Sequence, residues 1–279
     1  MITAAEEAHI GRHAYLPEHV PEYVTAISQT EPFLFGNFLA YAKRGLVILV
    51  GYPLGEPFDE KRMEQACEEA VKRLKPACVS LMAPSIPASL EKVGHPPSDH
   101  YFRLDLPSLT ISQKLRNMLK RAGRELTVGE NTHFDDEHTE MVAGFLKTRS
   151  VDEATRFIFQ RIDRYLASSG TAVVFDARTG GGELVAFDIA DFKPRDYALY
   201  MFNFRSDTRY IPGASDLLLA RMIDQAKTAG KRYINLGLGI NPGVVFFKEK
   251  WGGITFLPHT FCLYHPPRKG LLEMILQSL

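Results

Sequence analysis

The sequence predicts an α/β protein, of the α+β kind with mixed sheets, built from two tandem units. Short apolar, β-prone runs alternate with segments whose apolar residues recur at helical spacing. One order of elements occurs twice: hairpin strands, a glycine-bearing break, a helix, a strand, a short helix and a strand. Pro96 and Pro97 mark a linker between the two occurrences. The expected domains are therefore residues 1–98 and 99–279.

The composition narrows the function classes. Of the 279 residues, 45% are hydrophobic and 24% are charged, which suits a globular protein with sizeable cores. Lysine plus arginine and aspartate plus glutamate are each 33, so the zero net charge argues against a general nucleic-acid binder. The 3 cysteines are far apart, with no Cys-x-x-Cys pair, so we expect a reducing compartment, no disulfide framework and no metal site.

Nothing in the sequence suggests a membrane protein. The first residues lack the basic start and apolar run of a signal peptide. The longest apolar run, Leu46 to Val50, is far too short to span a bilayer. We therefore expect no membrane span and a cytoplasmic location.

The first predicted unit begins with a helix over 16–29. Two β-prone runs joined by Lys43-Arg44-Gly45 predict a hairpin. An amphipathic helix and a further strand follow the glycine-bearing break. The expected elements after the first helix are strands 33–42 and 46–52, helix 59–74, strand 77–83 and a short helix over 85–93.

The second predicted unit opens with a half-buried strand and a basic helix. Asp135 and Asp136 suit a helix start, because aspartate caps free backbone amides. This cap is a better interpretation than a metal site, since the neighbouring His133 and His138 are five residues apart and do not share a helix face. The expected elements are strand 100–106, helix 111–122, strand 125–130, helices 136–147 and 151–167, strands 171–178, 183–191 and 197–204, helix 214–229, strand 232–238, helix 244–250, strand 255–264 and a tail helix 268–279.

The stretch from Arg209 to Gly253 organises the second unit. It reads as loop, helix, strand, loop, helix and turn. The helix that starts after Pro212-Gly213 presents free amides and a positive dipole end, which can bind an anion. An ordinary capped helix start is the alternative.

This stretch resembles the acyl-CoA-binding half of the GNAT acyltransferase superfamily. The phosphate loop of that family reads Gln/Arg-x-x-Gly-x-Gly/Ala. Arg209 and Ala214 fit its first and last positions, and Pro212 replaces the middle glycine.

A second motif lies further along the same stretch. The family places an asparagine, then a small residue at +3, tyrosine at +7, lysine at +9 and glycine at +11. The matching positions here are Asn241, Val244, Lys248, Lys250 and Gly252, with Lys248 in place of the tyrosine. The ending from Phe247 to Gly253 is similar to Fem-type aminoacyl transferases and to the C-terminal region of phosphatidylglycerol lysyltransferases. Those relatives consist of two GNAT-like halves and take their acyl group from aminoacyl-tRNA.

The resemblance implies roles for individual residues. The residues implied to bind the acyl donor are Arg209, Gly213, Ala214, Ser215 and Asn241. Alternatively, Asn241 only organises its turn. Lys248 stands where relatives place the acid that protonates the leaving thiolate; as a lysine it needs a lowered pKa, or else acts as a fixed cation. On a short helix it is alternatively a surface lysine.

Polar residues after strand 197–204 border the expected acyl site. Asp207 is a candidate general base, and Asn203 and Arg205 are candidate substrate-binding residues. A solvated loop is the alternative interpretation of this segment.

These observations lead to one hypothesis and two alternatives. The first is transfer of an acyl group from acyl-CoA to an amine acceptor, a small molecule or a peptide, by two tandem GNAT-like domains of which 1–98 is degenerate and 99–279 carries the donor site. The second is an aminoacyl-tRNA-dependent transferase acting on a peptide or lipid headgroup. The third is a non-catalytic GNAT-like protein that binds a small molecule.

Overall fold

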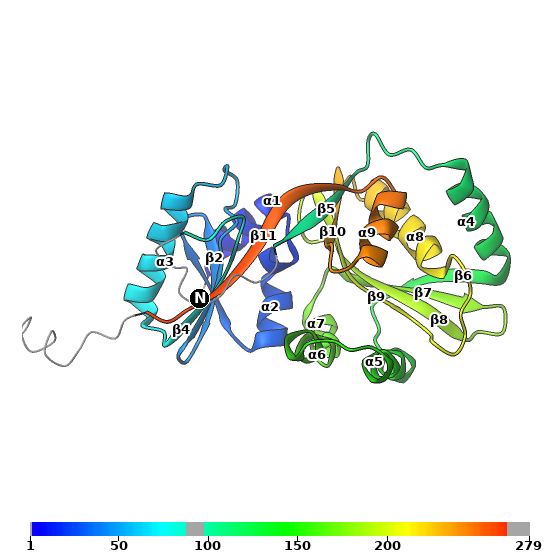
Figure 1. Ribbon diagram of the computed structural model, residues 1–279, viewed down its shortest axis with the longest axis horizontal. Coiled ribbons are helices and arrows are strands. Elements are labelled where there is room, and N and C mark those ends of the chain that lie inside the picture. Colours follow the sequence, from blue (N-terminus) through cyan, green and yellow to red (C-terminus); the bar gives the residue numbers. More distant parts are fainter. Residues whose placement is uncertain (1, 88–97, 267–279) are drawn as a thin grey trace, which may run out of the picture. The chain divides into compact units, whose positions relative to one another are not determined.

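The computed structural model describes residues 2–87 and 98–266, which belong to two compact units (Figure 1). The first unit comprises the described residues of Glu31–Ser98 and His259–Leu279, and the second comprises Ile2–Thr30 and Asp99–Pro258. One change of unit falls between residues 98 and 99. However, residues 2–30 belong to the second unit, and residues 259–266 belong to the first. That the linear segments 1–98 and 99–279 are separate GNAT-like domains remains a prediction.

The first unit is a mixed sheet with one long helix packed on it. The strand order is β1-β2-β3-β4-β11, and only the β3–β4 pair is parallel. The amphipathic helix α3 (Glu60–Leu74) buries Met63, Ala66, Cys67 and Ala70 against this sheet. The strands are β1 (Glu31–Phe35), β2 (Phe38–Lys43), β3 (Leu46–Val50), β4 (Cys78–Ala83) and β11 (Ile254–Tyr264), which passes from the second unit into the first at His259.

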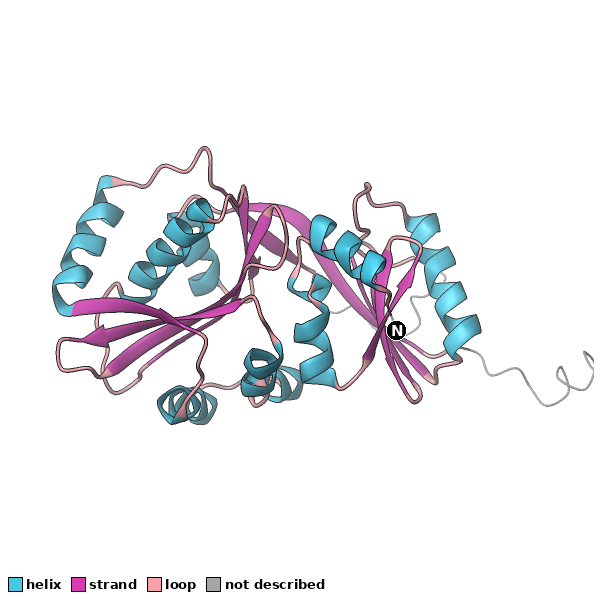
Figure 2. Cartoon of the chain, turned by 180° about the vertical axis from the view of Figure 1, so that it is seen from behind, coloured by secondary structure: helices cyan, strands magenta, loops and turns pink. Residues whose placement is uncertain are grey.

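The second unit contains a six-stranded run in the order β5-β10-β9-β8-β7-β6 (Figure 2, magenta). All neighbours are antiparallel except β9 and β10, which are parallel. A parallel pair requires a crossover, and helix α8 supplies it. The strands are β5 (Asp99–Asp105), β6 (Leu126–Asn131), β7 (Ala172–Thr179), β8 (Leu184–Asp191), β9 (Tyr197–Arg205) and β10 (Tyr233–Leu238).

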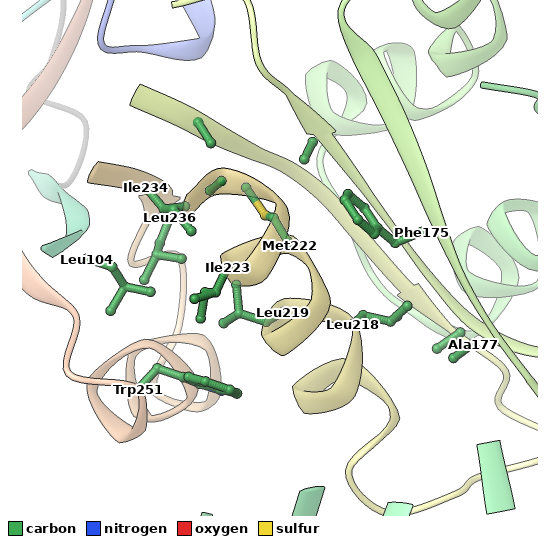
Figure 3. Close-up of a cluster of buried hydrophobic side chains, with 14 of the residues drawn as sticks. Leu104, Phe175, Ala177, Leu218, Leu219, Met222, Ile223, Ile234, Leu236 and Trp251 are labelled. Carbon is green, nitrogen blue, oxygen red and sulfur yellow. The ribbon is translucent and has the colours of Figure 1, made fainter. Parts of the chain in front are cut away.

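Helices cover both faces of this sheet. Helices α4 (Gln113–Glu125), α8 (Ala214–Thr228) and α9 (Pro242–Lys250) pack on one face through a core that includes Leu218, Met222 and Trp251 (Figures 1 and 3). On the other face, residues of four helices form a second core with Phe187 and Phe204. These helices are α2 (Pro21–Ser28), α5 (Asp136–Thr148), α6 (Glu153–Phe159) and α7 (Ile162–Ser168).

Most predicted elements are present, with differences at turns. The run over 33–42 is two strands, because Gly36 at φ +58° turns the chain between β1 and β2. The helix expected over 151–167 breaks at Arg161, whose non-helical backbone separates α6 from α7. The helix expected over 16–29 is a 3₁₀ turn (Pro17–His19) followed by α2. Helix α1 (Ala4–His13) was missed, although its capping box, Thr3 with Glu6, is visible in the sequence.

Three predicted features fall wholly or partly outside the described residues. These are most of the short helix over 85–93, the proline linker at 96 and 97, and the tail helix over 268–279. Within residues 2–87 and 98–266, no helix combines the length and the apolar character needed to cross a bilayer.

Candidate functional site

The centre of the second unit contains a fork between two parallel strands. β9 and β10 pair only from Tyr197 with Tyr233 to Leu199 with Asn235. Beyond that point β9 continues to Arg205 beside β8 alone, and β10 continues to Leu238 beside β5 alone. Beyond Leu199 and Asn235 the facing edges of β9 and β10 are therefore not paired with each other, and strand addition is one way in which such edges bind an extended ligand.

The turn after β10 is held in an unusual backbone conformation. Gly237 has φ +76°, and Ile240 has φ +60° although it is β-branched and 75% exposed. The carboxylate of Asp99 accepts hydrogen bonds from the amides of His100, Gly239 and Ile240 at 2.6, 3.0 and 2.8 Å. A Cβ on Gly239 would lie 2.6 Å from Oδ1 of Asp99, so a larger residue here would displace this carboxylate from its hydrogen bonds.

Lys248 points from α9 into this turn. Its side chain is buried, with 2% of the residue exposed, and its ammonium group donates a hydrogen bond to the carbonyl of Leu238 and lies 5.5 Å from the centroid of the Phe102 ring. Burial lowers the pKa of Lys248 to about 7, although the negative charge of Asp99 opposes this shift. Near pH 7 both the protonated and the neutral form of Lys248 are therefore populated, unlike those of a surface lysine.

The predicted donor loop forms the start of α8. Gly213 caps the helix at φ +86°, and a Cβ there would lie 3.2 Å from both Met118 and Ala122 of α4. Among the described residues, the amides of Ser215 and Asp216 have no hydrogen-bond acceptor, whereas that of Ala214 donates to Ile211. Two free amides at the positive end of a 15-residue helix fit an anionic group.

The charged residues predicted around this loop are exposed. Arg209 pairs with Glu183 at 3.2 Å, and the guanidinium group of Arg205 lies over the ring of Tyr210. Asp207 accepts hydrogen bonds from Thr148 and Arg149. The bond from Thr148 and the charge of Arg149 lower the pKa of Asp207, so this carboxylate is a weak base.

Two of the predicted residues meet beneath the start of α8. Oγ of Ser215 lies 3.2 Å from Nδ2 and 3.3 Å from Oδ1 of Asn203. Nδ2 of Asn203 also donates to Oδ1 of Asp188, which accepts from the hydroxyl group of Tyr200 at 3.3 Å as well. Asn203 therefore joins the donor loop to a buried carboxyl group in β8.

Asn241 and Lys250 have structural partners. The side-chain oxygen of Asn241 caps α9 by accepting from the amide of Val244 at 3.1 Å. Lys250 forms an ion pair with Asp216 at 2.6 Å, and Nε1 of Trp251 donates to the same oxygen at 2.9 Å. Lys250 thus faces α8, whereas Lys248 faces the β10 turn.

Sequence reasoning missed Asp99, Asp188 and Asp216. Asp188 has one detectable signal, a carboxylate in the apolar strand run VAFDIA, where only a paired or neutral acid is tolerated. Asp99 has no such signal, because its partners Gly239 and Ile240 are 140 and 141 residues away.

Comparison with known proteins decides the family of this region. Residues 110–248 match the family model described as an acetyltransferase (GNAT) domain. This part of the chain belongs to the GNAT family. The match covers α4 to α9 and therefore includes the fork, the donor loop and Lys248. No match is found among curated proteins.

Solved structures show the same fold over more of the chain. L-PGS from Bacillus licheniformis matches with a TM-score of 0.59 at 15% identity, covering 99% of this chain and 96% of that one. FemX matches with a TM-score of 0.60 at 11% identity, covering 93% and 96%. A tandem GNAT protein from the clavulanic acid biosynthesis pathway matches with a TM-score of 0.53 at 12% identity, covering 83% and 79%. The fold is therefore that of tandem GNAT proteins over nearly the whole chain.

Proposed function

We propose that the protein is an N-acyltransferase that moves an acyl group from acyl-CoA to an amine acceptor, with Lys248 at the reacting centre. The observation that carries this proposal is the buried ammonium group of Lys248 at the fork between β9 and β10. GNAT relatives place an acid at this position of the motif. With a pKa of about 7, Lys248 can act as an acid at neutral pH.

In the proposed reaction, the amine attacks the carbonyl carbon of the donor, and the C–S bond breaks as the new C–N bond forms. Protonated Lys248 stabilises the negative charge that develops and gives its proton to the leaving thiolate. The proton released by the amine restores Lys248 or leaves to solvent. Asp207 remains a candidate acceptor of that proton, but its lowered pKa and exposed position make it less suited than neutral Lys248.

The donor loop supports an anionic ligand but supplies few donors. The amides of Ser215 and Asp216 fit a phosphate group, and Arg209 is close in sequence. Pro212 contributes no amide where relatives have glycine, and Asp216 brings a carboxylate that Lys250 neutralises. This set fits a single phosphate group better than a pyrophosphate.

The sparse donor set favours a second candidate, an aminoacyl-tRNA-dependent transferase acting on a peptide or lipid headgroup. Its donor is an ester with no pyrophosphate to hold at α8. The basic side chains along α4, Lys114, Arg116, Lys120 and Arg121, would then contact tRNA phosphates. The full-length fold likeness to L-PGS and FemX is consistent with this candidate.

Ligand-induced stabilisation separates the candidates. A ligand that binds only the folded state raises the melting temperature, by an amount that grows with its concentration above Kd. We expect CoA and acetyl-CoA to raise it. A shift with aminoacyl-tRNA alone would favour the second candidate, and no shift with either ligand would favour the non-catalytic alternative.

Substitution of Lys248 tests the reacting centre. Lys248→Met should retain the fold and most donor binding, yet lower single-turnover transfer by ~100-fold, the scale of losing a general acid or an oxyanion donor. The wild-type rate should fall as pH rises through about 7, where Lys248 loses its proton, and the variant should lack this dependence. The matched control is Lys227→Met at the exposed end of α8. Equal, small losses in both variants would remove Lys248 from the mechanism.

A further inference from the structure

Asp188 lies in β8 with 0% of its surface exposed, and only one of its carboxyl oxygens is satisfied. Oδ1 accepts hydrogen bonds from Asn203 and Tyr200, whereas Oδ2 has no hydrogen-bond partner within residues 2–87 and 98–266. Burial raises the pKa of Asp188 well above its usual range, and the nearby charge of Asp216 adds to this shift, against the two hydrogen bonds. Its surroundings therefore disfavour ionisation of Asp188.

Asp191, three residues along the same strand, shows how the chain satisfies a structural carboxylate. Its oxygens accept hydrogen bonds from Tyr165 at 2.5 Å, Thr171 at 2.8 Å and the amide of Lys193 at 2.7 Å. Asp188 has no comparable set, since its two hydrogen bonds both go to Oδ1. An unsatisfied buried oxygen destabilises the folded chain, so its retention calls for an explanation.

Asp188 is connected through Tyr200 to α9, the helix that carries Lys248. Tyr200 links the two, because its hydroxyl group donates to Asp188 while its ring stacks on that of Phe247, with centroids 6.5 Å apart. The carbonyl oxygen of Tyr200 and the ammonium nitrogen of Lys248 lie 3.9 and 3.8 Å from the position that a Cβ on Gly237 would occupy. Tyr200 therefore joins the carboxyl group of Asp188, through its hydroxyl group, to the part of the fork near Gly237, through its backbone carbonyl.

We propose that Asp188, together with Tyr200 and Asn203, forms a subsite for a primary ammonium group of the ligand that reacts at Lys248. An ammonium group supplies the missing donor and the opposite charge at once, which a neutral donor does not. Entry of the cation ionises the acid, so that the pair R-NH3⁺ and carboxylate forms and one proton is released to solvent. The ammonium group belongs either to the transferred acyl group or to the acceptor. The placement of this subsite rests on the proposed function, but its ligand chemistry does not.

Three small probes test the subsite without any transfer reaction. Glycinamide and propionamide have the same number of heavy atoms and differ by an ammonium group in place of a methyl group. Ethylamine carries the ammonium group without the carbonyl. Titrations followed by NMR of the labelled full-length protein should give glycinamide a Kd about tenfold or more below that of propionamide, with shifts in β8 and β9 signals. A tenfold difference is the scale of one charge-assisted hydrogen bond.

Substitutions assign the preference to Asp188. Asp188→Asn has nearly the same shape and no charge, so it should fold, melt no lower than wild type, and bind glycinamide and propionamide equally. Tyr200→Phe should reduce the preference in part, and Asp191→Asn should keep it. Calorimetry in buffers of different ionisation enthalpy should show proton release with glycinamide for wild type and none for Asp188→Asn. Equal binding of both amides by wild type, or an unchanged preference in Asp188→Asn, would overturn the subsite.

The titrations with glycinamide and ethylamine also distinguish the two sources of the ammonium group. If it belongs to the acyl group, glycinamide should bind more tightly than ethylamine, and Lys248→Met should abolish that advantage, because the carbonyl then reaches Lys248. If it belongs to the acceptor, ethylamine should bind as tightly as glycinamide. Acetyl transfer by a protein that binds glycinamide and propionamide equally would refute the subsite and leave the proposed function standing. A preference for glycinamide without acetyl transfer would support the subsite and refute the proposed function.

Discussion

The pKa values of two buried side chains in the second unit, Lys248 and His138, are shifted in opposite directions. Lys248 is buried with one carboxylate nearby, and its pKa falls to about 7. His138 is just as buried, and burial alone would lower its pKa. However, Asp176 and Asp135 contact its two ring nitrogens at 2.9 and 2.6 Å, and together they raise the pKa of His138 above its usual value. The number of charged partners therefore decides the direction of the pKa shift in these two residues.

His138 should make stability depend on pH. Because its pKa is higher in the folded than in the unfolded chain, its contribution is full below about pH 6.5 and is lost as pH rises through the folded pKa. His138→Gln keeps a side chain that suits the third position of a helix but removes the charge. In urea unfolding, the difference in unfolding free energy between wild type and variant should shrink by ~1 kcal/mol or more from pH 5.5 to pH 8.5. A pH-independent difference would mean that His138 is neutral in the folded chain.

At this scale the sequence predicts local partners and misses distant ones. Asp135 was expected to cap a helix, and its capping box with His138 confirms this. The second partner of His138, Asp176, is 38 residues away and pairs only because β7 places it there. Lys248 was identified by motif spacing, whereas Asp99, which holds its turn, has no local signal. The assignment of the nine predicted site residues stays a prediction.

The start of α8 shows how one glycine positions an element. Gly213 needs a left-handed backbone, and its missing Cβ lets α8 approach Met118 and Ala122 of α4. The amides of Ser215 and Asp216, which have no acceptor among the described residues, follow directly at this helix start. The sequence shows a Pro-Gly break at this point, but the packing partner from α4 is about 90 residues earlier and is not visible there.

Gly213→Ala should therefore destabilise the second unit. The substitution combines the cost of a left-handed alanine with contacts at 3.2 Å, so we expect a loss of ~1–3 kcal/mol in unfolding free energy. Gly123→Ala is the matched control, since Gly123 lies within α4 with no atom within 4 Å of its would-be Cβ. That change should raise stability by ~0.5–1 kcal/mol. Both are measured by chemical denaturation. A neutral Gly213→Ala would show that the loop can shift, and would weaken its role as a shaped anion site.

The compact units of the whole molecule do not follow the linear order of the chain. Residues 2–30 pack in the second unit, where they bury Ile10, Leu16 and Val20. Periodicity and turn signals predict the order of elements well because these signals are local. They do not predict which strands pair over separations such as the 185 residues between Val79 and Tyr264. The predicted division at 98 and 99 therefore follows the order of elements in the sequence, whereas the contact units follow the packing.

Residues 2–30 should be required for the stability of the second unit. Nδ2 of Asn235, at the last paired position before the fork, donates to the carbonyl of Tyr15 at 2.7 Å, and the amide of Arg195 donates to Gly11 at 2.9 Å. Ile27 packs in the second core with α7. Deleting this segment leaves the buried Asn235 side chain and the Arg195 amide without these partners. It also exposes several apolar side chains worth ~1.5–3 kcal/mol each, a large share of a typical stability of ~5–15 kcal/mol.

Hydrogen exchange of the deletion variant locates the effect. We expect amide protection to fall in β9, β10 and α7, while β1 to β3 of the first unit keep theirs, because their hydrogen bonds lie within that unit. Asn235→Ala is the milder counterpart. It removes the donor to Tyr15 and the acceptor for the amide of Gly237, and should cost ~1–3 kcal/mol with the same pattern of lost protection. Unchanged protection in β10 after the deletion would mean that the fork is stable without the N-terminal segment.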